Sequence, residues 1–102
     1  MSRRQAREAA LQTLFQLELN PPPETASEES WQTWALDAAV AEMPLETKRD
    51  YRYAASLVRG TRENLAAIDE EIAASTRDWK IDRMTGVDRN IVRIALYEMK
   101  YR

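Results

Sequence analysis

The amino-acid sequence predicts an all-α fold. Apolar residues recur three and four positions apart through most of the chain, which is the spacing of one helix face. No stretch of useful length alternates apolar and polar residues as a half-buried strand does. With 102 residues, 44% of them hydrophobic and 31% charged, the chain has the size and composition of one small globular domain.

The first helix is predicted from about residue 3 to residue 19. Ser2 with Gln5 matches a capping box, in which each side chain satisfies a free backbone N–H group of the first turn. The apolar stripe that follows consists of Ala6, Ala10, Leu14 and Leu17. Three consecutive prolines at positions 21–23 cannot continue a helix, so the helix ends before them.

A second helix is predicted between these prolines and Pro44. Thr25 with Glu28 forms another capping box ahead of the stretch SWQTWALDAAVAEM, where apolar residues again follow helical spacing. Trp31 and Trp34 could form a partner surface, but tryptophans at this spacing more often belong to a core. We assign the acidic residues of this segment to a solvated face.

A single long helix is predicted from about residue 46 to residue 77. Its apolar stripe, spaced four, three, four, three and four residues apart, consists of Ala54, Val58, Thr61, Leu65, Ile68 and Ile72. The stripe crosses Gly60 without losing phase, so this glycine is either a tolerated weak point or a close packing contact. A break near Asn64 is the alternative, and Trp79 is expected to cap the apolar seam.

The last helix is predicted from about residue 86 to the end of the chain, after a connector with the sequence KIDRMTG. Thr85 with Asp88 provides its cap. Basic and aromatic residues then share one side: Arg89, Arg93, Tyr97, Lys100 and Tyr101. Such a mixture suits a nucleic-acid backbone of phosphates with unstacked bases between them. The alternative is that Arg93 pairs with an internal carboxylate and that the tyrosines lie at the edge of the core.

The composition excludes most catalytic and metal-dependent classes. Because the chain has no His and no Cys, it cannot form a His/Cys zinc site, a His-dependent triad or a thiol nucleophile. Gly60 and Gly86 are its only glycines, which leaves no phosphate-binding glycine loop. The sequence therefore predicts a binding protein and not an enzyme, with no cofactor and no metal.

A cytoplasmic location is expected. No run approaches the roughly 18 consecutive apolar residues of a membrane span. The basic start is interrupted by Glu8, Gln12 and Gln16, which does not fit the apolar core of a signal peptide. The absence of cysteine fits a reducing compartment.

Charge is segregated along the chain, although the net charge is only −2. Three basic residues, Arg3, Arg4 and Arg7, open the sequence. Eight acidic and no basic residues follow from Glu8 to Thr47, and basic residues again exceed acidic ones after residue 76. Each cation at a helix N-terminus lowers the stability of the helix by about a few tenths of a kcal/mol, so the three arginines suggest an anionic partner. The alternative is that these arginines are simply solvated.

The chain resembles the NusB family of bacterial transcription antitermination factors. Three runs carry the resemblance: R-R-x-A-R-E from Arg3, L-V-x-G-x-x-x-N-L-x-x-I-D-x-x-I from Leu57 to Ile72, and V-D-R-N-I-x-R-I-A-x-Y-E from Val87 to Glu98. They occur in the family's order and cover most of the chain outside the proline loop and the second helix.

The resemblance implies two small helical bundles packed roughly at right angles, with an N-terminal three-helix bundle. It also implies binding of boxA leader RNA together with NusE, the ribosomal protein S ten, so that RNA polymerase reads through terminators in ribosomal RNA operons. Carried over by position, the RNA contacts are Arg3, Arg4, Arg7 and Arg89, with Arg89 also a possible partner contact. The residues that would face NusE are Phe15 and Asp88.

The chain departs from the family pattern at its end. Family members continue with a short loop and two more helices that bear I-N-E-A and F-V-N-G runs, and neither run occurs here. We therefore expect one truncated NusB-like RNA-binding domain over residues 1–102, with an incomplete second bundle. Two alternatives remain: the RNA-binding module of an rRNA cytosine methyltransferase, and a homodimeric helical interaction domain without RNA binding.

Overall fold

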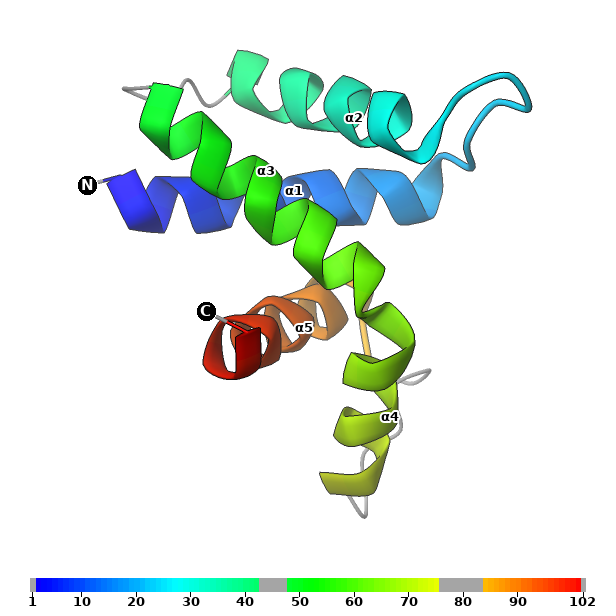
Figure 1. The fold of residues 1–102 in the computed structure, drawn as a ribbon, viewed down its shortest axis with the longest axis vertical. Helices are drawn as coiled ribbons and strands as arrows, with labels where there is room; N and C mark the ends of the chain where they lie inside the picture. The colour runs from blue at the N-terminus through cyan, green and yellow to red at the C-terminus, as the bar shows by residue number, and fades with distance from the viewer. Residues whose placement is uncertain (1, 43–47, 76–83, 102) are drawn as a thin grey trace.

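Five α-helices make up the described part of the chain, which comprises residues 2–42, 48–75 and 84–101 of a computed structural model. They are α1 (Ser2–Leu19), α2 (Glu28–Glu42), α3 (Lys48–Glu63), α4 (Leu65–Ser75) and α5 (Gly86–Tyr101) (Figure 1). These residues contain no strand, which confirms the all-α prediction.

The helices form two groups that share one core. α1 and α2 run side by side in opposite directions, α3 crosses them, and α4 and α5 lie beyond the crossing (Figure 1). The main apolar cluster contains Leu14 of α1, Trp31 of α2, Leu57 of α3, Ile68 of α4 and Ile94 of α5. The three-helix bundle is therefore continuous with the smaller pair, because all five helices contribute to the same buried cluster.

The prediction of one unbroken helix from residue 46 to residue 77 is wrong, and the alternative break near Asn64 is confirmed. α3 ends at Glu63, and α4 leaves in a new direction (Figure 1). The Asn64 side-chain Nδ2 donates to the backbone oxygen of Gly60 at 2.8 Å, beside the backbone N–H of Asn64 at 3.1 Å. Asparagine side chains compete with the helix for backbone groups in this way, so the helix axis can turn here while the apolar stripe stays buried.

The helix caps agree only in part with the predictions. Ser27, and not Thr25, caps α2, because its Oγ accepts a 3.0 Å hydrogen bond from the backbone N–H of Ser30. Thr85 caps α5 as predicted, with its Oγ1 3.1 Å from the backbone nitrogen of Asp88. The side chain of Ser2 lies outside the described residues, as do Pro44, Trp79 and the connector before Met84.

Gly60 is a close packing contact between α3 and α5. A Cβ atom at this position would lie 2.1 Å from both Cζ and Oη of Tyr97. Tyr97 is buried, as the core interpretation of this residue predicted, and its ring stacks on Tyr101 with 5.4 Å between centroids. The absence of a side chain at Gly60 therefore lets the tyrosine ring lie directly on the α3 backbone.

Candidate functional site

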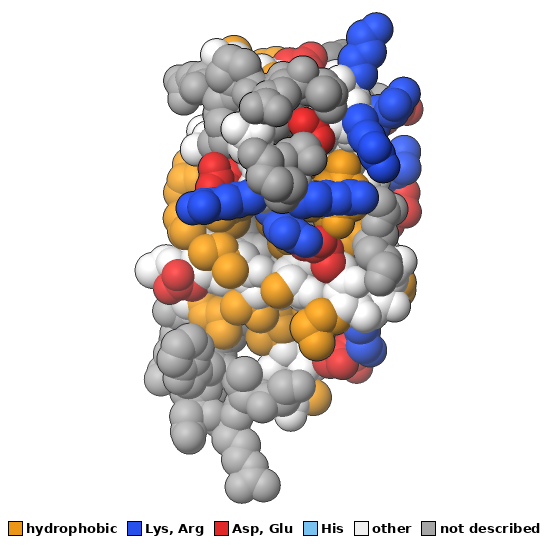
Figure 2. Space-filling view, turned by 90° about the vertical axis from the view of Figure 1, so that its left-hand side faces the viewer, with side chains coloured by type: hydrophobic (Ala, Val, Ile, Leu, Met, Phe, Trp, Pro, Cys, Tyr) orange, Lys and Arg blue, Asp and Glu red, His pale blue; other side chains and the backbone are white. Residues whose placement is uncertain are grey.

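The basic residues at the start of α1 form one end of the molecule. Figure 2 shows this end face on, with Lys and Arg side chains gathered over its upper part and hydrophobic side chains below them. Besides Arg3, Arg4 and Arg7, this end includes exposed residues from the first turns of α3: Lys48, Arg49 and Arg52. We call these six residues the basic end. The sequence alone did not point to the three α3 residues.

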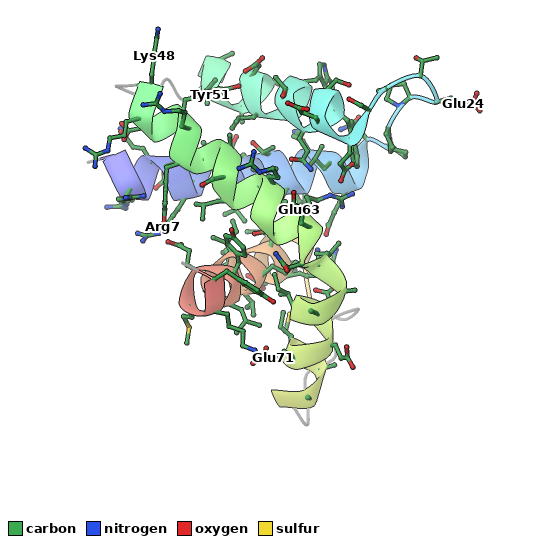
Figure 3. All side chains as sticks on the ribbon, viewed as in Figure 1. Arg7, Glu24, Lys48, Tyr51, Glu63 and Glu71 are labelled. Carbon is green, nitrogen blue, oxygen red and sulfur yellow. The ribbon has the colours of Figure 1, made fainter. Side chains whose placement is uncertain are left out.

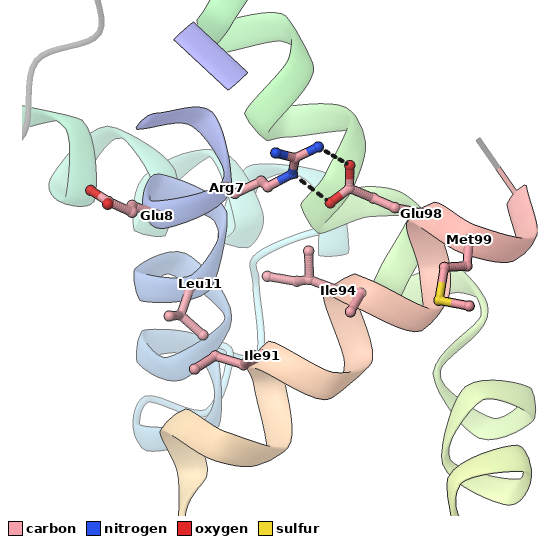
Figure 4. A pocket seen from close by; sticks show the side chains of 8 residues that line it. Arg7, Glu8, Leu11, Ile91, Ile94, Glu98 and Met99 are labelled. Carbon is pink, nitrogen blue, oxygen red and sulfur yellow. Dashed lines mark hydrogen bonds and ion pairs between the residues drawn. The ribbon is translucent and has the colours of Figure 1, made fainter. Parts of the chain in front are cut away.

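Arg3 and Arg7 are held in defined positions by α3 and α5. The guanidinium of Arg3 lies 3.6 Å from the ring centroid of Tyr53. Arg7 donates from Nε and Nη2 to the two carboxylate oxygens of Glu98 at 2.8 and 3.0 Å (Figure 4). The hydroxyl of Tyr53 donates to the same carboxylate at 2.7 Å. This network joins three helices and fixes the direction of both arginines.

These contacts keep Arg7 and Glu98 ionised near neutral pH. The hydrogen bond to Glu98 raises the pKa of Arg7 further above its usual value. The same bond lowers the pKa of Glu98, against the opposing effect of burial, and the Tyr53 hydroxyl adds to the lowering. Arg4 differs, because its side chain is 83% exposed and pairs with Glu8 of the same helix at 3.4 Å. Arg4 is therefore more exposed to solvent than Arg7, whose side chain is 50% exposed.

Glu98 competes with any anion that binds Arg7. We expect Glu98→Gln to tighten RNA binding about threefold, because an exposed ion pair is worth up to ~1 kcal/mol and the substitution removes it. Fluorescence anisotropy with a short single-stranded RNA measures the change, with Glu63→Gln, an exposed carboxylate at the end of α3, as the control for one lost negative charge. Weaker binding by Glu98→Gln would mean instead that Glu98 orients Arg7 for the RNA.

Arg89 lies at the other end of α1, apart from the basic end. Its Nη2 and Nε contact Glu18 at 2.9 and 3.3 Å, and its Nη1 donates to the backbone oxygen of Met84 at 3.2 Å. Glu18 is separated from Arg7 by about three helical turns, or roughly 16 Å along the axis. The structure therefore does not bring Arg89 together with Arg3, Arg4 and Arg7, and its RNA contact stays a prediction.

Arg93 is a structural residue, as the internal-pairing alternative predicted. Its side chain is buried and donates bidentately to Asp69 at 2.8 and 2.7 Å, and to Glu18 at 2.6 Å. It also contacts Asn90 at 3.1 Å. Burial opposes ionisation of Arg93, but the bonds to Asp69 and Glu18 outweigh it and raise the pKa. Arg93 thus links α1, α4 and α5 through hydrogen bonds and is not part of an exposed anion site.

Phe15 and Asp88 lie around the start of α5. The ring of Phe15 packs against Gly86, where an added Cβ would be 2.7 Å from Cε1 of the ring. Asp88 is exposed in the first turn of the same helix, two residues further on. Both predicted partner residues therefore lie near the start of α5, and their role in partner binding stays a prediction.

An apolar groove separates the two ends on the α1–α5 side. It has a volume of about 390 Å³, and its apolar lining includes Leu11, Ile91, Ile94 and Met99 (Figure 4). Ile91 and Met99 are exposed. The groove explains why α5 is apolar on several sides: one side faces the core, and another lines a groove that is open to solvent.

A metal cluster and a membrane-spanning helix are both absent from the described ranges. No group of three or more carboxylate, His or Cys side chains in residues 2–42, 48–75 and 84–101 could hold a metal ion. None of the helices in the described part of the chain is both long enough and apolar enough to cross a membrane.

The described helices place the chain in a class of small, all-helical proteins. The family model described as "NusB family" matches residues 4–102 of this sequence. The chain therefore belongs to the NusB family.

Individual relatives agree with this assignment. Transcription antitermination protein NusB from Pelotomaculum thermopropionicum is 48% identical over 97% of this chain and 62% of the relative. The protein of the same name from Bdellovibrio bacteriovorus is 45% identical over 98% of this chain and 67% of the relative. The chain thus spans about two thirds of the length of the curated relatives it matches.

A solved structure also shares the fold. A chain in a structure described as "Crystal Structure of a Plectonemic RNA Supercoil" matches with a TM-score of 0.80 and 26% identity. The match covers 99% of this chain and 68% of the other. The observed arrangement of helices is therefore that of a known all-helical protein.

Proposed function

We propose that this protein is a cytoplasmic transcription antitermination factor that binds boxA leader RNA together with NusE. The observation that carries the proposal is the basic end, where six exposed Lys and Arg residues come from the first turns of α1 and α3. The curated relatives are named for transcription antitermination, and the similar solved structure is named for an RNA. These names favour this function over the methyltransferase-module alternative.

The geometry of the basic end suits a single-stranded RNA. Phosphates carry one negative charge per nucleotide, and arginines bind them with paired N–H groups. Arg4 is open to solvent, while Arg3 and Arg7 are held in place by Tyr53 and Glu98. Arg3, held on the ring of Tyr53, loses less conformational entropy on binding a phosphate, whereas Arg7 exchanges Glu98 for the phosphate.

The triple variant Arg3→Ala/Arg4→Ala/Arg7→Ala is expected to weaken RNA binding at least tenfold. Each lost phosphate contact should also reduce the slope of log K against log salt by about 0.7, the value for single strands. Titrations at several salt concentrations measure both effects. Arg59→Ala, which removes an exposed arginine elsewhere on α3, is the control and should change neither. An unchanged slope in the triple variant would remove the start of α1 from the site.

NusE is proposed to bind around the start of α5. Phe15→Ala and Asp88→Asn are each expected to weaken the complex with NusE about tenfold while leaving RNA binding by the isolated chain unchanged. Calorimetry with purified NusE measures this, and Glu8→Gln on the exposed side of α1 is the matched control. Unchanged affinity in both variants would exclude this surface.

A second candidate is a homodimeric helical interaction domain without RNA binding. The observation that favours it is the exposed apolar side of α5, which includes Ile91 and Met99. Light scattering across a range of concentrations, with an RNA titration beside it, separates the two functions. Dimerisation without RNA binding would support this second candidate over the first.

A further inference from the structure

Tyr53 of α3 contacts both parts of the arginine network at the basic end. The guanidinium of Arg3 lies 3.6 Å from the centroid of its ring, and its hydroxyl donates to Oε2 of Glu98 at 2.7 Å. The same carboxylate oxygen accepts a 3.0 Å hydrogen bond from Nη2 of Arg7. Tyr53 is half-buried and packs against the main apolar cluster, so the core holds its ring in place. It therefore contacts Arg3 directly and Arg7 through Glu98.

The N–H groups that Arg7 gives to Glu98 are not available to a phosphate. Its Nε and Nη2 both donate to the carboxylate, at 2.8 and 3.0 Å (Figure 4). A phosphate that takes over this side of the guanidinium leaves behind a carboxylate that is only 17% exposed. Removing the partner of a largely buried charge is unfavourable unless another group hydrogen-bonds to it. The exchange of Glu98 for a phosphate therefore depends on what stays bound to Glu98.

The hydroxyl of Tyr53 can stay bound to Glu98 during this exchange, because its hydrogen bond does not involve Arg7. The hydrogen bond from Arg7 contributes most to lowering the pKa of Glu98, and burial opposes it. The hydrogen bond from Tyr53 and the nearby charge of Arg3 lower the same pKa. Two groups besides Arg7 thus stabilise the ionised carboxylate.

We infer that Tyr53 is a positioning residue of the RNA site: its hydroxyl retains Glu98 while Arg7 moves onto a phosphate, and its ring holds Arg3 in place for a neighbouring phosphate. The inference rests on the proposed RNA binding and adds a residue that acts through the arginines. A neutral hydroxyl stabilises the carboxylate without taking a cation from the phosphate. An aromatic face attracts a guanidinium, and Arg3 and Arg7 lie one turn apart on α1.

Tyr53→Phe tests the hydroxyl, because this substitution keeps the ring. It should weaken binding of a short single-stranded RNA about fivefold, since Glu98 then retains Arg7 more strongly. In the Glu98→Gln background the same substitution should change the affinity by less than about twofold, because the charge that needs the hydroxyl is gone. Tyr51→Phe is the matched control and should not change RNA affinity. It also removes a hydroxyl that donates to a carboxylate, that of Asp37 at 2.6 Å, but Tyr51 lies beside α2, whereas Arg7 extends toward α5 (Figure 3).

Tyr53→Leu tests the ring. RNA binding should be about threefold weaker than in Tyr53→Phe, because the cation–π contact with Arg3 is lost as well. In the Arg3→Ala background the two variants of Tyr53 should bind RNA equally. Circular dichroism checks that each variant is folded. A measurement on the unsubstituted chain needs no such check: the ring-current shift of the Arg3 Hε resonance should persist when RNA binds.

Tripolyphosphate, a chain of phosphates without bases, separates this inference from the RNA proposal. The variants should show the same pattern with tripolyphosphate, because the exchange needs only phosphates. If they do and boxA RNA does not bind, the RNA proposal fails and the inference stands. The role of the hydroxyl is overturned by unchanged affinity in Tyr53→Phe, by an equal loss with and without Glu98→Gln, or by no binding of either anion. Loss of the Arg3 ring-current shift on binding, or equal affinity of Tyr53→Leu and Tyr53→Phe, overturns the role of the ring.

Discussion

Gly60→Ala is expected to lower the free energy of unfolding by about 2 kcal/mol and the Tm by roughly 10 °C. In an ordinary helix interior the same substitution stabilises by up to ~1 kcal/mol, because alanine has the higher helix propensity. Here the new methyl group would meet the ring of Tyr97 at 2.1 Å. Tyr97 is buried, so its ring cannot move away without disturbing the contact between α3 and α5.

Thermal and urea unfolding followed by circular dichroism measure this effect. The control is Arg59→Ala at the adjacent exposed position, which should change stability by less than about 0.5 kcal/mol. In the double variant Gly60→Ala/Tyr97→Ala the two losses should be less than additive, since the clash disappears with the ring. A more stable Gly60→Ala variant would show that α3 and α5 do not pack this closely.

Arg93→Met is expected to cost about 3 kcal/mol of stability at neutral pH. Removing one partner of a buried ion pair leaves the other charge without compensation; here Asp69 loses its ion pair with Arg93, while Glu18 loses Arg93 but keeps Arg89. Both carboxylates are about a quarter exposed, which keeps the loss at the lower end of the range for buried pairs. Arg4→Met, with a largely exposed ion pair, is the control and should stay within about 0.5 kcal/mol.

The pH dependence gives a second readout for Arg93. Burial opposes ionisation of Glu18, but the hydrogen bonds from Arg89 and Arg93 outweigh it and lower the pKa from its ordinary 4.5. Because the pKa is lower in the folded state, this stabilisation is complete above pH 4.5 and is lost as the pH falls through the folded value. The stability difference between wild type and Arg93→Met should therefore shrink below pH 4.5; a constant difference would contradict the ion-pair account.

Helix content was largely predictable because it depends on local patterns. Proline positions and helical spacing located the first, second and last helices, and Thr85 capped the last as expected. The break at Asn64 was less certain, because the apolar stripe continues through it and only a side-chain bond to the Gly60 carbonyl marks the turn. Ser27 displaced Thr25 as the cap of α2 because both residues can serve, and tertiary packing decides between them.

The candidate site was less predictable because it depends on contacts far apart in the sequence. Arg7 and Glu98 are separated by 91 residues, and Tyr53 joins them from a third helix. The contribution of Lys48 and its neighbours depends on the direction in which α3 crosses α1, which no local pattern encodes. Trp31 and Trp34 have the same spacing signal, but Trp31 packs into the main apolar cluster of the helices, whereas Trp34 is exposed.

The central claim is that the basic end binds boxA RNA and that NusE strengthens this binding. The most direct measurement is a titration of boxA RNA and of a scrambled RNA of equal length, each with and without NusE. We predict weak binding of both RNAs by the chain alone, with a preference for boxA that grows at least tenfold when NusE is present. Equal, weak binding of both RNAs under all conditions would contradict the account.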